Sequence, residues 1–361
     1  MAAVTHYFNV RSLKAAIEEV VRGFGSEPSE VELVTDNLIE ANLTGHDSHG
    51  IGMLPRYALS LKEAGGLKAN AHISILTDHG SMLGLDGHAG FGQVIGHEAM
   101  QLGIERTEQH GSCIMSLGNV HHLCRIGAWA EMATAAGLIS IHFVNVMSKP
   151  VVAPWDGADG RFGTNPFCVG IPVEGRPPVI LDFATSVIAQ GKTRVAYNKG
   201  EKLKPGQMID HEGKPTTDPA YGVIPPYGAI KTFGEHKGFG MSLVCELLGG
   251  ALSAGQTLHD RPTYSRVFNG MLTILIDPGR LAQHNRFVQE SLAFLDWVKQ
   301  SPPIEGTDGV KIAGEPEQAT KADRLRNGIP VDEKTWREIL HAANTLGVDP
   351  DAVDRLARAS D

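Results

Sequence analysis

Apolar side chains in the first part of the chain recur at the spacing of amphipathic helices. The first set follows the pattern i, i+3, i+4, i+7, i+8, i+11 and consists of Leu13, Ala16, Ile17, Val20, Val21 and Phe24. This spacing predicts a helix that Ser12 caps and that stops at Gly25. A second helix is expected to begin around Ser26 and Pro28 and to end at Gly45. Its apolar face would carry Val31, Val34, Leu38 and Ala41.

The rest of the chain divides into a central part with short apolar runs and a C-terminal part with a helical pattern. From about residue 80 the short runs are 113–117, 138–146, 179–181 and 271–276. Runs of this length between Gly-rich turns predict buried strands of an α/β domain. The C-terminal helical face consists of Trp336, Ile339, Leu340, Ala343 and Leu346, before a stop at Gly347. We therefore expect mainly helical segments at residues 1–78 and 296–361 around a central α/β domain at residues 79–295.

Two stretches of the predicted central domain stand apart from this pattern. Residues 239–255 are the most hydrophobic long stretch, but Glu246 and several Gly and Ser interrupt it, so we expect a buried helix and not a membrane span. Residues 197–238 are rich in turn formers and lack periodicity. Such a long loop is usually a lid or an arm that reaches a partner. We therefore expect a homodimer, in which this arm buries apolar side chains against the second subunit, namely Met208, Ile224, Tyr227 and Ile230.

The net charge excludes one large class of partner. The chain of 361 residues has 32 basic and 41 acidic side chains and a formal net charge of -9. Proteins that bind along nucleic acid phosphates carry an excess of positive charge, so a nucleic acid partner is not expected. The N-terminus lacks the features of a signal peptide, and the four cysteines are too far apart for a redox pair or a zinc knuckle. We expect a cytoplasmic protein with no membrane segment and no bound metal.

Candidate chemistry is concentrated first in the sequence His46-Asp47-Ser48-His49-Gly50, directly after the second helix. Histidine titrates near neutral pH, so an imidazole that a neighbouring hydroxyl orients is suited to donate and accept protons. The alternative is a turn whose polar side chains only cap backbone groups. A zinc site is not favoured, because no Cys or Glu follows the two histidines at the spacing of metal ligands.

A second candidate lies where a predicted strand, the run from 113 to 117, is followed by Gly118-Asn119-Val120-His121-His122. We expect a helix to start near Leu123, with Arg125 in its first turn. A cation is unfavourable at a helix N-terminus unless it serves an anion, so this turn is a candidate site for a pyrophosphate. The alternative is an ordinary connection between a strand and a helix.

Three further turns carry polar residues at places where ligands bind in α/β proteins. Asp182 follows the run 179–181, and Thr164 lies with Asn165 in a tight turn that is suited to a carboxylate. His236 and Lys237 open the Gly-rich helix. The stretch 90–96 resembles a dinucleotide-binding loop, but its last interval is one residue too long and no acidic residue follows at the required distance. We therefore do not predict a Rossmann fold.

Seven motifs in this order resemble the malate/L-lactate dehydrogenase family over nearly the whole chain. They are HDSHGIGMLPRY, GNVHHLCRIGAWAEMA, GRFGTNPF, ILDFATS, GKTRVA, FGEHKG and AGEPEQ. The resemblance implies a three-layer, mixed-sheet α/β fold that differs from the Rossmann fold, with flanking N- and C-terminal helices and a central cofactor-binding domain. It also implies a homodimer. The implied activity is hydride transfer between a nicotinamide cofactor and a small 2-hydroxy acid or 2-oxo acid.

The resemblance also implies roles for individual residues. His49 is the expected proton donor and acceptor, Ser48 orients it, and Lys192 completes the catalytic set. Arg56 and Thr164 are the expected substrate ligands. The expected cofactor contacts are His49, His122, Cys124, Arg125, Ile126, Ile180, Leu181, Asp182, Phe183, Ala184, His236, Lys237, Asn269, Gly314, Glu315, Pro316 and Glu317.

The cofactor and the substrate class remain open in part. No pair of basic residues marks a site for a 2′-phosphate, which favours NAD, with NADP as the alternative. Imine-reducing members of the family carry Asp where this chain has Lys192, and a cation at this position favours a 2-hydroxy acid. Cyclic-imine or ureidoglycolate oxidation and reduction on the same scaffold is the first alternative function. A ligand-binding protein without catalytic activity is the second.

Overall fold

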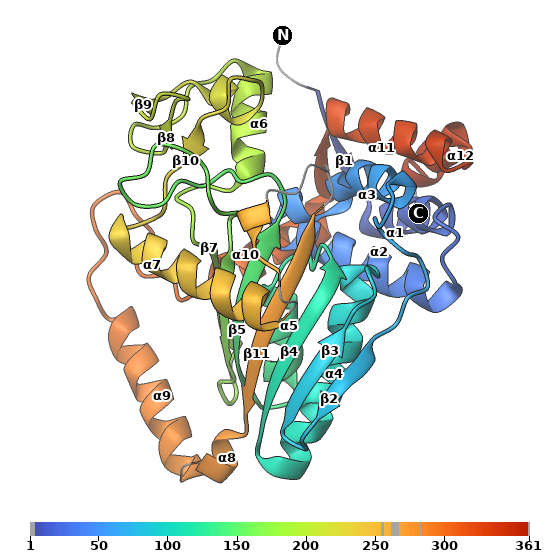
Figure 1. Ribbon diagram of the computed structural model, residues 1–361. Coiled ribbons are helices and arrows are strands. Elements are labelled where there is room, and N and C mark those ends of the chain that lie inside the picture. Colours follow the sequence, from blue (N-terminus) through green and yellow to red (C-terminus); the bar gives the residue numbers. More distant parts are fainter. Residues whose placement is uncertain (1–3, 254–255, 261–266, 282, 360–361) are drawn as a thin grey trace.

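The centre of the protein is a seven-stranded mixed sheet with the strand order β2-β3-β4-β11-β5-β6-β7 (Figure 1). The strands are β2 (Ser74–Asp78), β3 (Met82–Asp86), β4 (Ser112–His121), β5 (Ile139–Met147), β6 (Pro166–Ile171), β7 (Val179–Ala184) and β11 (Phe268–Ile276). The computed structural model describes residues 4–253, 256–260, 267–281 and 283–359. Only β3 and β4 pair in parallel among the described strands of this sheet, and the other neighbours are antiparallel. A Rossmann sheet is parallel, so this order confirms that the fold is of another type.

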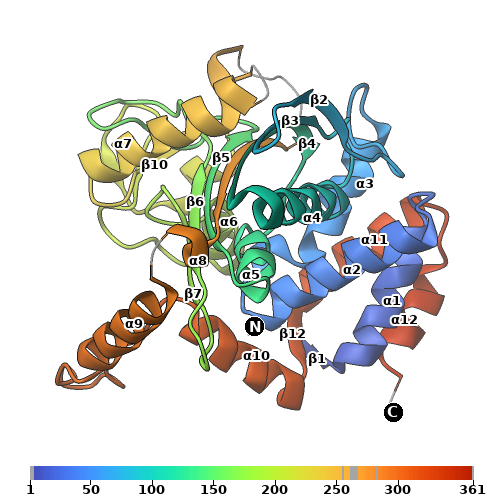
Figure 2. The same ribbon diagram turned by 90° about the horizontal axis from the view of Figure 1, so that it is seen from below.

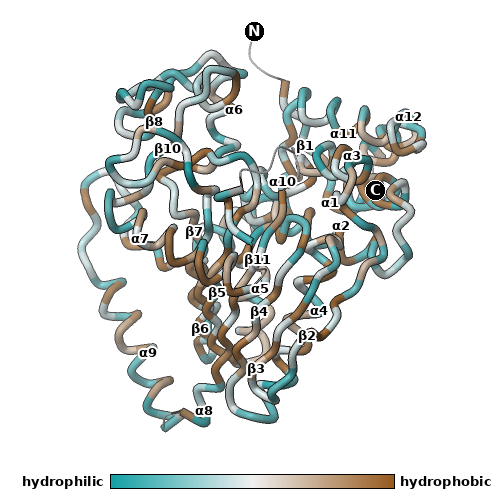
Figure 3. Tube along the Cα trace, viewed as in Figure 1, coloured by the Kyte–Doolittle hydropathy of each residue, from teal (hydrophilic) through white to brown (hydrophobic). Residues whose placement is uncertain are grey.

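Helices cover both faces of the sheet and make the expected three layers (Figure 2). One face carries α4 (Gly92–His110) and α5 (Gly127–Ala135), and the other carries α7 (His236–Cys245) with the π-helical segment η4 (Glu246–Leu252). The glycines of the stretch 90–96 serve this packing, because a Cβ added to Gly96 would lie 2.5 Å from the Trp129 ring. The trace is most hydrophobic in the central strands (Figure 3).

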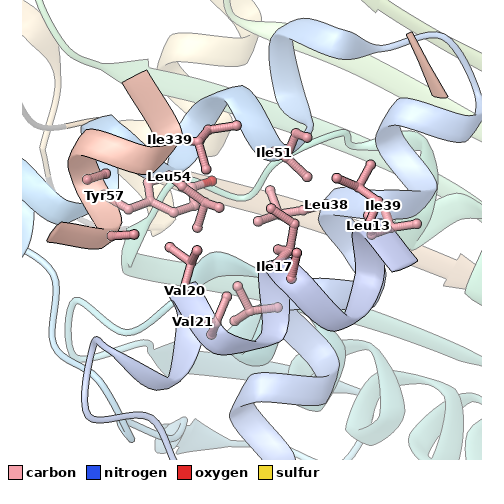
Figure 4. Close-up of a cluster of buried hydrophobic side chains, with 14 of the residues drawn as sticks. Leu13, Ile17, Val20, Val21, Leu38, Ile39, Ile51, Leu54, Tyr57 and Ile339 are labelled. Atoms are coloured by element: carbon pink, nitrogen blue, oxygen red, sulfur yellow. The ribbon is translucent and has the colours of Figure 1, made fainter. Parts of the chain in front are cut away.

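A helical layer at the side of the sheet joins the two ends of the chain. It contains α1 (Val10–Arg22), α2 (Pro28–Leu43), α3 (Leu54–Lys62), α11 (Glu333–Thr345) and α12 (Pro350–Ala357), with β1 (Thr5–Phe8) paired to β12 (Ile329–Asp332). The predicted apolar faces of the first two helices are confirmed, and they form one buried cluster with Tyr57 and Ile339 (Figure 4). The predicted cap of α1 is wrong. Asn9 accepts from the N–H groups of Arg11 and Ser12, while the Ser12 hydroxyl donates to Ala359.

The hydrophobic stretch 239–255 differs from its prediction as a buried helix. Only the side of α7 and η4 that packs on the sheet is buried, and residues 254–255 lie outside the described residues. The opposite side exposes Leu243, Val244, Leu247 and Leu252 by 41%, 40%, 51% and 61%. The reason is that a single helix on one face of a sheet can bury only the half that faces the strands. No described helix is both long and apolar enough to cross a membrane.

The predicted arm at residues 197–238 has its own folded structure. It begins in the last turn of α6 (Gln190–Lys199) and contains β8 (Met208–Ile209), β9 (Pro215–Thr216), the 3-10 turn η3 (Pro219–Gly222) and β10 (Ala229–Ile230). The strands β8, β9 and β10 form a small three-stranded sheet. Met208 and Ile230 are buried in a cluster with Val152 and Phe162 of the same chain. Their expected burial against a second subunit is therefore wrong, whereas Ile224 and Tyr227 stay 44% exposed.

The C-terminal third adds three helices outside the sheet. They are α8 (Pro278–Leu281), α9 (His284–Lys299) and α10 (Glu315–Asn327). Figure 2 shows α9 projecting from the body of the protein, and a bidentate ion pair between Arg176 and Asp296 ties it to the loop before β7. Phe294 and Trp297 lie on α9 with exposed fractions of 61% and 67%. The helix α10 returns toward the helical layer and contacts α2.

A buried histidine in the sheet makes the stability of the fold sensitive to acid. His142 on β5 is fully buried and bonds to the Thr273 hydroxyl at 3.0 Å, and burial lowers its pKa from the usual value to about 3. In the unfolded chain this histidine binds a proton below a pH of about 6.5. Between these two values the free energy of unfolding therefore falls with falling pH, by about 1.4 kcal/mol per pH unit from this residue.

We expect the variant His142→Gln to lose less stability than the unchanged protein when the pH is lowered from 7 to 5. The difference between the two proteins should change by about 2 kcal/mol, as measured by urea unfolding at both pH values. An identical loss in both proteins would show that His142 binds its proton equally well in the folded and unfolded states.

Candidate functional site

The histidine-rich turn after α2 forms two short 3-10 turns, η1 (Asp47–His49) and η2 (Ile51–Met53). Asn42 in the last turn of α2 holds them, because its amide donates to Asp47 at 2.7 Å and accepts from the Ile51 N–H at 2.8 Å. A Cβ added to Gly50 would lie 2.0 Å from the Asn42 side chain, so glycine is required there. Arg324 of α10 binds both oxygens of Asp47, at 2.6 and 3.0 Å. The first half of the motif is therefore structural.

The second half of the motif contributes His49, whose imidazole pairs with that of His122, the residue directly after β4. The Ser48 hydroxyl lies 3.0 Å from His49 Nδ1. The His49 ring stacks on the His122 ring, with 5.5 Å between centroids and 17° between planes. Burial, followed by the charges of His46 and Arg125, lowers the pKa of His49 to about 4. Burial also holds the pKa of His122 well below its usual value. Both rings are therefore uncharged at neutral pH.

The connection after β4 differs from the predicted turn and helix. Pairing with β11 extends β4 to His121, and α5 begins only at Gly127, so Arg125 lies before the helix and not in its first turn. The Gly127 N–H, which would have been available to a pyrophosphate, donates to the Asp182 carboxylate at 2.7 Å. The N–H of Gly127 is therefore already paired, while the expected phosphate contact of Arg125 stays a prediction. A carboxylate of β7 caps the helix because it favours the positive end of the helix dipole.

The residues of this connection are held from several sides. Cys124 has a φ of +64° and donates its thiol proton to the His49 carbonyl at 2.8 Å. Asn269 uses its side-chain amide to accept from the Leu123 N–H and to donate to the Asn145 carbonyl, both at 2.8 Å. Arg125 is 4% exposed and forms an ion pair with Glu131. Burial raises the pKa of Asp182, against the lowering effect of the Gly127 N–H and the Arg125 charge.

Two of the predicted cofactor segments lie next to each other. The Ile180 N–H on β7 donates to Ala313 at 3.1 Å, and Gly314, with a φ of +98°, precedes the first turn of α10. A Cβ at Gly314 would approach the Ile180 backbone to 3.4 Å. The residues Glu315 to Glu317, which were predicted as cofactor contacts, are the first turn of this helix. Glu317 also lies 3.4 Å from His46. The structure therefore connects β7, α10 and the histidine-rich turn.

Arg56, a predicted substrate ligand on α3, and Lys192, a predicted catalytic residue on α6, belong to helices that approach the two imidazoles. The start of α6 faces the site, because a Cβ added to Gly191 would lie 3.3 Å from Ser48 Cβ. Lys192, the next residue, is exposed. Burial, and to a lesser extent the charge of Arg194, lowers the pKa of Arg56. The charge of Arg56 in turn lowers the pKa of His122. Arg194 was not predicted as a site residue, although it lies in the motif GKTRVA.

Other predicted residues lie farther from the two imidazoles or have structural contacts. Thr164 is half-buried, and its carbonyl accepts from the Thr185 N–H and hydroxyl, while the Asn165 side chain accepts from Val146. His236 and Lys237 are exposed in the first turn of α7. They follow Phe233, whose ring packs on Phe183 of β7 at 5.3 Å. Within the described residues, no group of three or more His, Cys, Asp or Glu side chains has an arrangement that would hold a metal ion.

Sequence reasoning missed two buried residues behind His122. Tyr57 of α3 and Gln93 of α4 are fully or almost fully buried, and they lie within hydrogen-bond distance of each other at 3.1 Å. The Tyr57 hydroxyl lies 2.8 Å from His122 Nδ1. The only signal in the sequence is that Tyr57 belongs to the first quoted motif. No spacing rule connects a tyrosine on one helix with a histidine 65 residues later.

Comparisons with known proteins show the family and the fold of the chain. A family model described as malate/L-lactate dehydrogenase matches residues 8–340. Hydroxycarboxylate dehydrogenase B of Escherichia coli is 46% identical over 346 residues, which cover 95% of each chain. Among solved structures, a putative malate/lactate dehydrogenase from E. coli has a TM-score of 0.94 at 45% identity, covering 97% of this chain and 98% of that one. Sulfolactate dehydrogenase from Methanocaldococcus jannaschii has a TM-score of 0.85 at 30% identity, covering 96% and 99%.

The contacts of Cys124 lead to a prediction about thiol reactivity. Burial raises the pKa of Cys113 and Cys124 to about 11 and that of Cys245 to about 12, and it raises that of Cys168 as well. Only the thiolate is strongly nucleophilic. We expect iodoacetamide at pH 7.5 to label none of the four cysteines in the native protein and all four after unfolding, as counted by mass spectrometry. Rapid labelling of native Cys124 would contradict the hydrogen bond that its thiol donates to the backbone carbonyl of His49.

Proposed function

Because the chain belongs to the malate/L-lactate dehydrogenase family, we propose that it transfers hydride between a nicotinamide cofactor and C2 of a small 2-hydroxy acid or 2-oxo acid. Its relatives, among them hydroxycarboxylate and sulfolactate dehydrogenases, support an oxidoreductase that acts on 2-hydroxy acids. The single observation that carries the proposal is the geometry of half-buried His49, whose ring the Ser48 hydroxyl orients at 3.0 Å and the His122 ring stacks on. An imidazole in this state can accept the proton that leaves a hydroxyl group during oxidation.

The chemistry of the site fits a dinucleotide. Arg125 offers a buried guanidinium for phosphate, and Asp182 beside it offers a carboxylate for ribose hydroxyls. The residues that would hold the cofactor are His49, His122, Cys124, Arg125, Ile126, Ile180, Leu181, Asp182, Phe183, Ala184, His236, Lys237, Asn269, Gly314, Glu315, Pro316 and Glu317. Nicotinamide, when bound, donates or accepts the hydride. The carboxylates Asp182, Glu315 and Glu317 would repel a 2′-phosphate, which supports NAD over NADP.

His49 then handles the proton. For its Nε2 to accept a proton from the substrate hydroxyl, Nδ1 must carry the ring proton and donate it to Ser48, which lies 3.0 Å away. In the direction of reduction, a protonated His49 returns the proton to the oxygen on C2. The positive charges of Arg56, Lys192 and Arg194 attract the substrate carboxylate, with Thr164 as a further ligand, in a protein whose net charge is -9.

The low pKa of His49 determines how the rate depends on pH. With a pKa of about 4, His49 is already unprotonated at pH 6, so kcat/KM for oxidation of a 2-hydroxy acid should stay constant between pH 6 and 8. The kcat/KM for reduction should fall with rising pH, because the protonated fraction of His49 decreases about tenfold per pH unit above the pKa. The measurement is initial rates in both directions, with NADH and NADPH on a panel of 2-oxo acids and with NAD⁺ and NADP⁺ on the corresponding 2-hydroxy acids. No turnover with any of them would overturn the proposed function.

The variant His49→Ala is the control for this profile. It should lose about 100- to 10,000-fold in turnover, lose the pH dependence of reduction, and still bind NADH in a fluorescence titration. A turnover close to that of the unchanged enzyme would remove His49 from the reaction.

We further propose a cytoplasmic homodimer that forms through the outer side of α7 and η4. This side exposes four neighbouring apolar side chains, Leu243, Val244, Leu247 and Leu252. Contiguous exposed apolar patches of this kind usually mark an interface. The arm exposes Ile224 and Tyr227, and it contributes to assembly or to covering the site. The area available for association is larger if α9, with Phe294 and Trp297, packs on the partner as well.

We expect the variant Leu247→Asp to shift the protein from dimer to monomer, because the interface would then bury an unpaired carboxylate. Leu356→Asp on α12 is the matched control, since that leucine is 38% exposed and lies in the helical layer. Light scattering after gel filtration measures both. A monomeric unchanged protein, or a dimer of the Leu247→Asp protein as tight as that of the control, would contradict this interface.

A further inference from the structure

The two residues behind His122 belong to a chain of hydrogen bonds that ends at the site. Gln93 Nε2 lies 3.1 Å from the Tyr57 hydroxyl oxygen and 3.5 Å from the Cys124 sulfur. The Tyr57 hydroxyl lies 2.8 Å from His122 Nδ1. All four residues are at most 9% exposed, so bulk water does not compete for these bonds. The proton positions in this chain are therefore determined by the protein groups alone.

The direction of each bond follows from the donor at one end. The Cys124 thiol donates its proton to the His49 carbonyl at 2.8 Å, so its sulfur can only accept from Gln93. This requires the NH₂ group of Gln93 on this side, and the same group donates to the Tyr57 oxygen. Burial keeps the pKa of Tyr57 well above its usual value, so the phenol retains its proton. Two acceptors lie near this proton: His122 Nδ1 is 2.8 Å from the Tyr57 oxygen, whereas the Cys124 sulfur is 4.0 Å from it. The phenol therefore donates to His122 Nδ1, the nearer and stronger acceptor.

The second ring nitrogen of His122, Nε2, is left for a ligand of the site. An uncharged imidazole whose Nδ1 accepts a proton carries its own proton on Nε2. Within the described residues, Nε2 of His122 has no hydrogen-bond partner, and the ring stacks on His49. The charge of Arg56 acts on the same ring. His122 thus presents a donor beside the proposed proton acceptor and near the proposed carboxylate ligand.

We propose that Tyr57, supported by Gln93, is a positioning residue that fixes His122 as the Nε2–H tautomer, so that His122 donates a hydrogen bond to an oxygen of the 2-oxo acid. This inference rests on the proposed function and moves His122 from the cofactor contacts to the substrate. His49 and His122 then have opposite tautomers in one stacked pair. His49 offers an unprotonated Nε2 to the substrate hydroxyl, whereas His122 offers a proton and does not exchange it.

The tautomer can be observed without turnover. Nitrogen-15 NMR of histidine-labelled protein should show His122 with an unprotonated Nδ1 and a protonated Nε2 throughout pH 6 to 8, identified by the signals that disappear in His122→Gln. In Tyr57→Phe, and also in Gln93→Leu, we expect a mixture of both tautomers. Tyr7→Phe is the matched control, because Tyr7 on β1 is 68% exposed. A protonated Nδ1 in the unchanged protein, or a single unchanged tautomer in both variants, would overturn the proposal.

Kinetics test the role of the donor. Tyr57→Phe should lower kcat/KM for the 2-oxo acid about tenfold, the effect of one uncharged hydrogen bond, while the dissociation constant of NADH stays the same. A loss of NADH affinity with unchanged kcat/KM for the oxo acid would overturn the assignment to the substrate. If no oxo acid is turned over by the unchanged protein, the proposed function fails, but the tautomer measurement still decides whether Tyr57 fixes His122.

Discussion

The site depends on the stacking of two imidazole rings, the buried ring of His122 and the half-buried ring of His49. Protonation of either imidazole, close to Arg56 and Arg125, is disfavoured both by desolvation and by repulsion between like charges. His49 and His122 are therefore uncharged at neutral pH, and the bonds to Ser48 and Tyr57 decide where each ring carries its proton. The acid–base chemistry of the proposed reaction follows from this one constraint. The charges of Arg125 and Arg56 further lower the pKa of His49 and His122, respectively, and in the proposed reaction the cations of Arg56, Lys192 and Arg194 attract the substrate carboxylate.

The fold meets this constraint by bringing together segments that are far apart in the sequence. The turn after α2 brings His49, the extension of β4 brings His122, and α10 locks the turn through the pair of Arg324 with Asp47. The mixed sheet makes the extension of β4 possible, because β11 pairs with it as far as His121. The carboxylate of Asp182 on β7 caps α5 and holds the connection that carries Arg125.

Local patterns in the sequence were sufficient to predict several of the helices and strands, and the motifs were sufficient to predict the family and the fold. The apolar face of α1 and the runs of β4, β5, β7 and β11 could be predicted because helical and strand periodicity depend on near neighbours. The start of α5 could not be predicted, since it is set by pairing with β11 and by Asp182, which is 55 residues away from Gly127. The exposed side of α7 could not be predicted from the sequence. Hydrophobicity indicates that burial of a side chain is favourable, but it does not indicate whether the same chain buries it.

The roles of buried polar residues were the least predictable part of the site. Tyr57 lies on a helix where an aromatic residue is ordinary core, and Gln93 lies in a glycine stretch that was weighed only as a cofactor loop. Their proposed role can be inferred only when α3, α4 and the end of β4 are assembled around His122. Asn269 was expected to contact the cofactor, and no pattern in the sequence predicted that its amide also holds the backbone at Leu123.

An NMR titration of His49 in the unliganded protein tests the central claim most directly, because every step of the proposed proton transfer depends on an uncharged ring at neutral pH. The account predicts a pKa of about 4 for His49. A pKa near the ordinary value of about 6.5 would contradict it, since the ring would then be exposed to water and neither desolvated nor held by its neighbours.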